Sequence, residues 1–199
     1  AFVVGGSDTR PTIVYASDGD GGSANRVVRM RVSRGESATT IVTEWATDHV
    51  FDNPHSITLH LKSGLLIVAD REHQALKLLR SADGKILGTW NCGLKFGKGF
   101  GVPFGVRTLS IFERDLLFVA SMDNPQDHKY QKISVIDTSQ LSSEQGTASA
   151  CSVLQTIEID PREYSGPHLL GVDKATGDVY AVLVADAPKS TVLRFRLNK

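Results

Sequence analysis

Three runs of β-forming residues recur along the chain at nearly equal intervals, and this period limits the possible folds more than any other feature. The runs "TIVYASD", "LLIVAD" and "DLLFVAS" end at Asp18, Asp70 and Ser121, which are 52 and 51 residues apart, and "GDVYAVLVAD" follows at about 60. After each comes a polar turn and another β-forming run, and after the first two a third run ends in Trp45 and Trp90. Short strands with a period near 50 residues are typical of β-propeller blades. We therefore expect an all-β propeller with few helices, since few segments sustain a 3.6-residue apolar period.

The repeats predict about four blades in a single domain that spans residues 1–199. A closed propeller has roughly 4 to 8 blades. The chain is therefore either a compact four-bladed propeller or the later blades of a larger one. The position of Ala1 directly before a blade strand favours the second alternative, and we expect the larger propeller to have six blades, the first of which lie outside this chain. The Ser-rich stretch 137–150 is expected to be a long loop and not a domain linker.

The charge balance argues against a nucleic-acid-binding or membrane-binding protein. Lys plus Arg and Asp plus Glu both number 22, whereas binding to nucleic acid or anionic lipid normally requires a basic excess. No apolar run approaches the roughly 20 residues that span a bilayer. The two cysteines, Cys92 and Cys151, either form one disulfide in an oxidising compartment or remain two half-buried thiols, and the sequence leaves both alternatives open.

Two histidines occupy the same place in two repeats. His55 and His168 both follow a proline and precede a glycine by nine residues. The innermost strand of each blade lines the central channel, so both imidazoles could reach one zinc ion, which in catalytic sites commonly has three protein ligands. The alternative is that Pro-His is repeat consensus, with each histidine hydrogen-bonded at a turn. The other histidines share no repeat position and are expected at the surface: His49, His60, His73 and His128.

Arg71 follows the acidic end of "VADRE", where a strand gives way to a turn. A guanidinium suits recognition of a carboxylate through two parallel hydrogen bonds. The alternative is an ion pair with Asp70 or Glu72 at the rim. Asp18 and Asp70 share a blade position, and we expect them to accept backbone N–H groups at turns and not to form a catalytic pair.

Nearly the whole chain resembles the NHL-repeat propellers, and within them the peptidyl-α-hydroxyglycine α-amidating lyases. Pro-His-Ser followed by Val-Ala-Asp-Arg-Glu is the most specific part of the match. The passages that carry the resemblance are "VYASDGDGGSANRVVRM" (14–30), "NPHSITLHLKSGLLIVADRE" (53–72), "GVPFGVRTLSIFERDLLFVAS" (101–121) and "GPHLLGVDKATGDVYAV" (166–182).

The resemblance implies a zinc ion held by three histidines, two of which match His55 and His168, with the third in an earlier blade. It implies that Arg71 contributes to the site and that a peptidyl-α-hydroxyglycine is cleaved to a peptide amide and glyoxylate. Zinc can help ionise the substrate hydroxyl, and an arginine can neutralise the departing carboxylate. It also implies a structural calcium ion and a secretory or extracellular location.

The chain departs from that family at several positions. Asp20 stands where the family has its catalytic tyrosine, and Tyr15 lies upstream within the strand. Leu169 replaces an acidic residue that helps to hold the calcium ion, and Ile67 and Leu78 stand at the positions of a local disulfide. Two functions are therefore compared: a zinc-dependent lyase, and a non-catalytic propeller that serves as a protein- or ligand-binding scaffold. An RNA-binding propeller is a third, weaker alternative, because the chain lacks a basic excess.

Overall fold

The computed structural model describes residues 2–4, 11–19, 24–92, 101–111, 113–122, 131–141, 151–160, 166–183 and 192–197. Every regular element in these ranges is a β-strand, which confirms the all-β prediction. Within the same ranges, no helix is long and apolar enough to cross a membrane.

The strands form four antiparallel sheets that follow one another in sequence, and each sheet is one blade. Blade 1 contains β1 (Phe2–Val4), β2 (Thr12–Asp18), β3 (Arg26–Arg34) and β4 (Thr39–Ala46). Blade 2 contains β5 (Pro54–His60), β6 (Leu65–Asp70), β7 (Ala75–Arg80) and β8 (Ile86–Trp90). Blade 3 contains β9 (Val102–Ile111), β10 (Arg114–Met122), β11 (Gln131–Asp137) and β12 (Ser152–Ile159). Blade 4 contains β13 (Pro167–Asp173), β14 (Asp178–Leu183) and β15 (Val192–Arg196).

The repeated sequence runs occupy equivalent strands, as predicted. The three runs that set the period are β2, β6 and β10, the second strand of each blade, and the runs that end in tryptophan are β4 and β8. Three of the hairpin turns end in a glycine with positive φ: Gly64, Gly84 and Gly177 have φ of 67°, 74° and 75°. Glycine adopts this conformation without steric cost, so these residues allow the short turns that the sequence clusters predicted.

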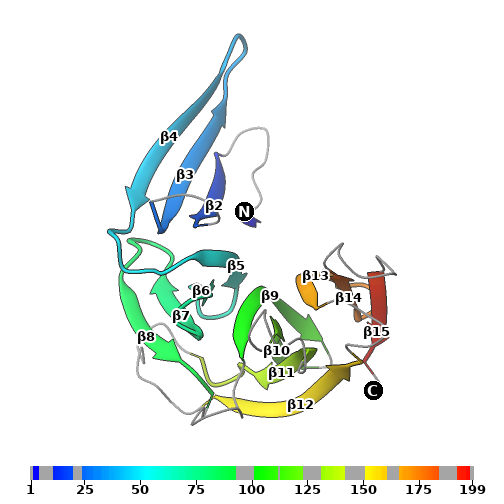
Figure 1. The fold of residues 1–199 in the computed structure, drawn as a ribbon. Coiled ribbons are helices and arrows are strands. Elements are labelled where there is room, and N and C mark those ends of the chain that lie inside the picture. Colours follow the sequence, from blue (N-terminus) through cyan, green and yellow to red (C-terminus); the bar gives the residue numbers. More distant parts are fainter. Residues whose placement is uncertain are drawn as a thin grey trace.

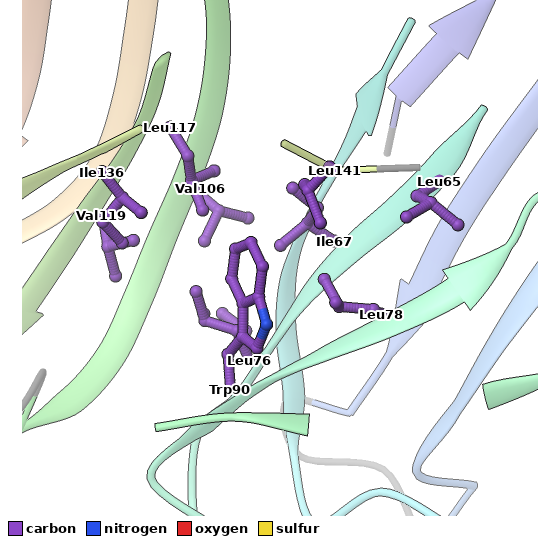
Figure 2. Close-up of a cluster of buried hydrophobic side chains, with 11 residues drawn as sticks. Leu65, Ile67, Leu76, Leu78, Trp90, Val106, Leu117, Val119, Ile136 and Leu141 are labelled. Atoms are coloured by element: carbon purple, nitrogen blue, oxygen red, sulfur yellow. The ribbon is translucent and has the colours of Figure 1, made fainter. Parts of the chain in front are cut away.

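The hydrophobic core lies between neighbouring blades. Figure 2 shows the cluster between blades 2 and 3, where Trp90 lies among aliphatic side chains that include Ile67, Leu76 and Val106. A second cluster joins blades 3 and 4, and a third joins blades 1 and 2. Ile67 and Leu78, the positions at which the resemblance to the lyases implied a local disulfide, are direct partners across β6 and β7. Both side chains are almost fully buried, so apolar packing occupies this part of the blade.

The four blades succeed one another along an arc, with blades 1 and 4 at its two ends (Figure 1). β9 lies between β5 and β13 and contacts both, so the first strands of three successive blades lie side by side on the inner side of the arc (Figure 1). The predicted total of six blades concerns sequence beyond this chain and stays a prediction. Of the predicted loop 137–150, residues 138–141 contain no strand, and 142–150 lie outside the described residues.

Cys92 and Cys151 form a disulfide bond, which decides between the two alternatives that the sequence left open. Cys92 follows β8 of blade 2, and Cys151 directly precedes β12 of blade 3. Both pack against the cluster shown in Figure 2. The bond therefore links the outer strands of two neighbouring blades beside the core that they share.

Candidate functional site

The inner strands of blades 2, 3 and 4 each contain the same irregularity close to their first residue. Pairing with the second strand skips one residue in each blade, so that this residue has no partner opposite it. The skipped residues are His55, Phe104 and His168, and each of them directly follows a proline. An unpaired residue of this kind is a β-bulge, which bends the strand and redirects a side chain.

The three redirected side chains meet. The ring centroids of His55 and His168 are 4.6 Å apart, and the two planes lie at 80° to each other. The Phe104 ring contacts both, with centroid distances of 5.1 Å to His55 and 5.3 Å to His168. The structure thus brings together the two histidines that the sequence separates by 113 positions.

A hydrogen bond sets the orientation of the His55 ring. His55 Nδ1 lies 2.8 Å from the backbone carbonyl oxygen of Phe104. A carbonyl oxygen only accepts, so Nδ1 carries a proton, and in the neutral ring the lone pair is on Nε2. Histidines that bind zinc commonly donate their other ring N–H to a carbonyl or carboxylate in this way.

The two histidines fit zinc in type and in the tautomer of His55, but they are fewer than the three protein ligands of a catalytic site. The described part of the chain contains no group of three His, Cys, Asp or Glu side chains placed to hold a metal ion. A third protein ligand would therefore come from outside the described residues, as the family resemblance implies.

Arg71 lies beside the same cluster, in the turn that follows β6. Its guanidinium carbon is 4.9 Å from the centroid of the Phe104 ring, and its backbone N–H donates to the carbonyl oxygen of Asn53, 3.1 Å away. Arg71 Nε also lies 3.0 Å from a carboxylate oxygen of Glu72. Arg71 thus forms the ion pair at the rim and also lies near the histidines. The Phe104 ring contacts Arg71 and both histidines.

The two equivalent aspartates differ in environment. Asp70 is fully buried, and its Oδ1 accepts the backbone N–H of Asp52 at 2.8 Å, as predicted for a turn residue. Its Oδ2 also contacts His73 and Lys77, at 2.7 and 2.6 Å. Asp18 is half-exposed and pairs with Arg26 at 3.1 Å.

Three positions at which the sequence departs from the lyases are Asp20, Tyr15 and Leu169. Asp20 lies outside the described residues. Tyr15 is buried between blades 1 and 2, and its hydroxyl donates to the carbonyl oxygen of Ser81 at 3.2 Å. Its hydroxyl is therefore engaged at an interface between blades and not at the histidine cluster. Leu169 directly follows His168, is 44% exposed and offers no side-chain oxygen to a cation.

Phe104 was not predicted as a site residue, and the surface position predicted for His60 is wrong. Pro103 stands at the place of the prolines that precede His55 and His168, so the shared proline was the available signal for Phe104. His60 was expected at the surface, but it is only 2% exposed because it ends β5 against blade 3. Among the other histidines, His49 and His73 are exposed, as predicted, although His73 also contacts Asp70, and His128 lies outside the described residues.

Gly105 permits β9 and β13 to approach each other at the site. A Cβ atom there would lie 2.9 Å from the carbonyl oxygen of His168. We predict that Gly105→Ala lowers the free energy of unfolding by about 1–3 kcal/mol, the usual cost of overpacking, measured by urea denaturation. Gly171→Ala is the matched control, since its Cβ would meet only the Tyr180 Cβ, at 3.9 Å. Equal stability of the two variants would contradict the close approach.

The chain is similar to proteins that contain NHL repeats. NHL repeat-containing protein 3 of Mus musculus is 33% identical over 174 residues, which are 84% of this chain and 42% of the relative. The Homo sapiens protein of the same name is 30% identical over 174 residues, which are again 84% of this chain and 42% of the relative. The chain therefore spans less than half the length of these curated relatives. No protein-family model matches the chain.

A solved structure supports the fold. A putative 6-phosphogluconolactonase from Bacteroides uniformis superposes with a TM-score of 0.60 over 99% of this chain and 53% of that chain. Its sequence identity is 10%, so this likeness concerns the fold alone. Together with the NHL-repeat relatives and the four antiparallel sheets, it supports a β-propeller built from NHL repeats.

Proposed function

We propose that this NHL-repeat β-propeller serves as a binding scaffold whose ligand site is the cluster of His55, His168, Arg71 and Phe104. The convergence of two imidazoles and a guanidinium on one buried aromatic ring supports this proposal. These groups come from three blades, so the site depends on the propeller arrangement and not on one local motif. The curated relatives are themselves named for their repeats.

The chemistry of the cluster indicates what it would bind. Imidazole nitrogens suit a zinc ion, and the guanidinium of Arg71 suits a carboxylate. The scaffold would therefore hold a zinc ion and, through Arg71, a ligand that ends in a carboxylate. The Cys92–Cys151 disulfide supports an oxidising location, in the secretory pathway or outside the cell, because disulfides rarely persist in the cytosol.

A zinc-dependent amidating lyase is the second candidate, and the contact between His55 and His168 favours it. In that reaction the C–N bond of a peptidyl-α-hydroxyglycine breaks, the hydroxyl loses its proton and becomes the aldehyde of glyoxylate, and the nitrogen gains a proton to form the amide. Zinc, when bound, would lower the pKa of the substrate hydroxyl. Arg71 would orient the substrate by its carboxylate and stabilise that charge as glyoxylate leaves.

The test measures zinc stoichiometry and glyoxylate release on the same protein samples. We expect zinc binding in the wild-type full-length protein, which would supply the third ligand, and at least a tenfold loss of affinity in both His55→Ala and His168→Ala. His49→Ala is the control, because His49 is exposed and shares no repeat position with the pair. Bound zinc without glyoxylate release from a peptidyl-α-hydroxyglycine would support the scaffold.

Glyoxylate release that falls in both histidine variants and in Arg71→Ala would instead establish the lyase. Arg71→Lys separates charge from geometry, since lysine keeps the charge but cannot form the planar two-bond contact. The absence of zinc from the wild type, or unchanged zinc binding in the two histidine variants, would exclude this cluster as a metal site.

A further inference from the structure

The opposite ends of the same inner strands border a cavity. His55 stands near the start of β5 and His60 at its end, and β9 and β13 run alongside. A cavity of about 140 Å³ lies where these strands end. The polar and charged side chains that matter for its chemistry are His60, Arg107, Thr108, Ser110, Asp115 and Lys174.

His60 presents a buried polar atom with no protein partner. The residue is 2% exposed, and its Nε2 is buried without a hydrogen bond. Its Nδ1 lies 2.7 Å from Ser63 Oγ, which itself accepts the backbone N–H of Leu65 at 3.3 Å. The backbone N–H of Ser63 also donates to Nδ1, at 3.4 Å, so Nδ1 is an acceptor and the Ser63 hydroxyl donates its proton to it. Nε2 therefore carries the imidazole proton and is an unsatisfied donor.

Buried donors are rarely left unsatisfied in folded proteins, so an orphan at a cavity wall indicates that something else occupies the cavity. Burial lowers the pKa of His60, which keeps the ring neutral near pH 7. The ring then offers one N–H and no charge, which suits an acceptor such as an oxyanion or a water molecule. The neighbouring charges distinguish between these two.

The charges around the cavity are predominantly positive. Arg107 keeps its charge although burial lowers its pKa, and its Nη1 donates to the backbone carbonyl oxygen of Val106 at 2.8 Å. Lys174 supplies a second cation from the turn after β13. Among the described residues that line the cavity, the single carboxylate is that of Asp115, which accepts from Ser110 Oγ at 2.6 Å and pairs with Lys62 at 3.3 Å. Asp115 is thus neutralised by its own partner, and Arg107 and Lys174 leave the cavity with an excess of positive charge.

We propose that this cavity binds a small oxyanion, either a carboxylate or inorganic phosphate, which accepts the Nε2–H of His60 and is attracted by Arg107 and Lys174. Both anions offer oxygen acceptors and negative charge, which is the chemistry shared by the two possible sources. The cavity volume of about 140 Å³ suits a small ligand of this kind. The site is separate from the histidine cluster at the other end of the inner strands, so the two can be tested independently.

The experiment titrates the full chain with sodium acetate and with sodium phosphate at constant ionic strength. It follows the heat of binding and the NMR signal of the His60 Nε2 proton. We expect saturable binding of at least one anion and a shift of that proton signal. The two titrations distinguish a carboxylate site from a phosphate site.

Lys174→Met should weaken binding at least tenfold without affecting folding, because Lys174 is exposed. His60→Gln should weaken it as well, and circular dichroism would verify that this variant folds. Lys85→Met is the matched control, since Lys85 is an exposed lysine in a turn of blade 2 and does not line the cavity. The proposal is overturned if neither anion binds saturably, which would leave water as the occupant, or if Lys174→Met binds as tightly as Lys85→Met.

Discussion

Removal of the Cys92–Cys151 disulfide should lower the free energy of unfolding by about 4 kcal/mol, the loop-closure value for a bridge of this span. The two cysteines are 59 residues apart in sequence. The bond therefore restricts a long segment of the unfolded chain, from the end of blade 2 through most of blade 3. Chemical denaturation of Cys92→Ser/Cys151→Ser against the wild type would measure the effect.

Two controls separate the bond from the side chains. Reduction of the wild-type protein with dithiothreitol should cause nearly the same loss as the double substitution, because both remove the bond. Each single substitution should match the double one for the same reason. Unchanged stability after reduction would contradict the pairing of Cys92 with Cys151.

The blade architecture could be predicted because it depends on short-range patterns that repeat. The β-forming runs that end at Asp18 and Asp70 are β2 and β6, and the turn "SADGK" contains Gly84 with the positive φ that such turns require. Each of these features depends on neighbouring residues. Their recurrence at a fixed period was therefore enough to predict the β-propeller fold, without any information on contacts between blades.

The candidate site could be predicted only in part, because it depends on contacts between blades. The shared Pro-His pattern identified His55 and His168, which the structure brings together. Phe104 was missed because an aromatic residue after proline carries no sign of chemistry until its position between two histidines is seen. His60 was misplaced because its burial results from packing against blade 3, which its local sequence does not encode. The pairing of Cys92 with Cys151 could not be decided from the sequence for the same reason, because the two residues belong to different blades.

Among the polar side chains of blade 2, loss of Asp70 should lower the free energy of unfolding most. It is fully buried, accepts the backbone N–H of Asp52 and pairs with Lys77, whose side chain is 12% exposed. Asp70→Ala leaves the ammonium of Lys77 without its anion in a poorly solvated place. Breaking one side of a buried ion pair typically costs about 3–5 kcal/mol, and we expect a loss of that size in urea denaturation.

Asp18→Ala is the matched control, because Asp18 ends the equivalent strand of blade 1 but is 44% exposed in its side chain. Exposed ion pairs contribute roughly 0–1 kcal/mol, so this variant should be close to the wild type. Asp70→Ala/Lys77→Met removes both charges and should recover part of the stability, because the uncompensated ammonium is then absent. If Asp70→Ala is no less stable than Asp18→Ala, burial does not determine the importance of this shared blade position. If the double variant recovers nothing, the backbone hydrogen bond to Asp52 is the main contribution of Asp70.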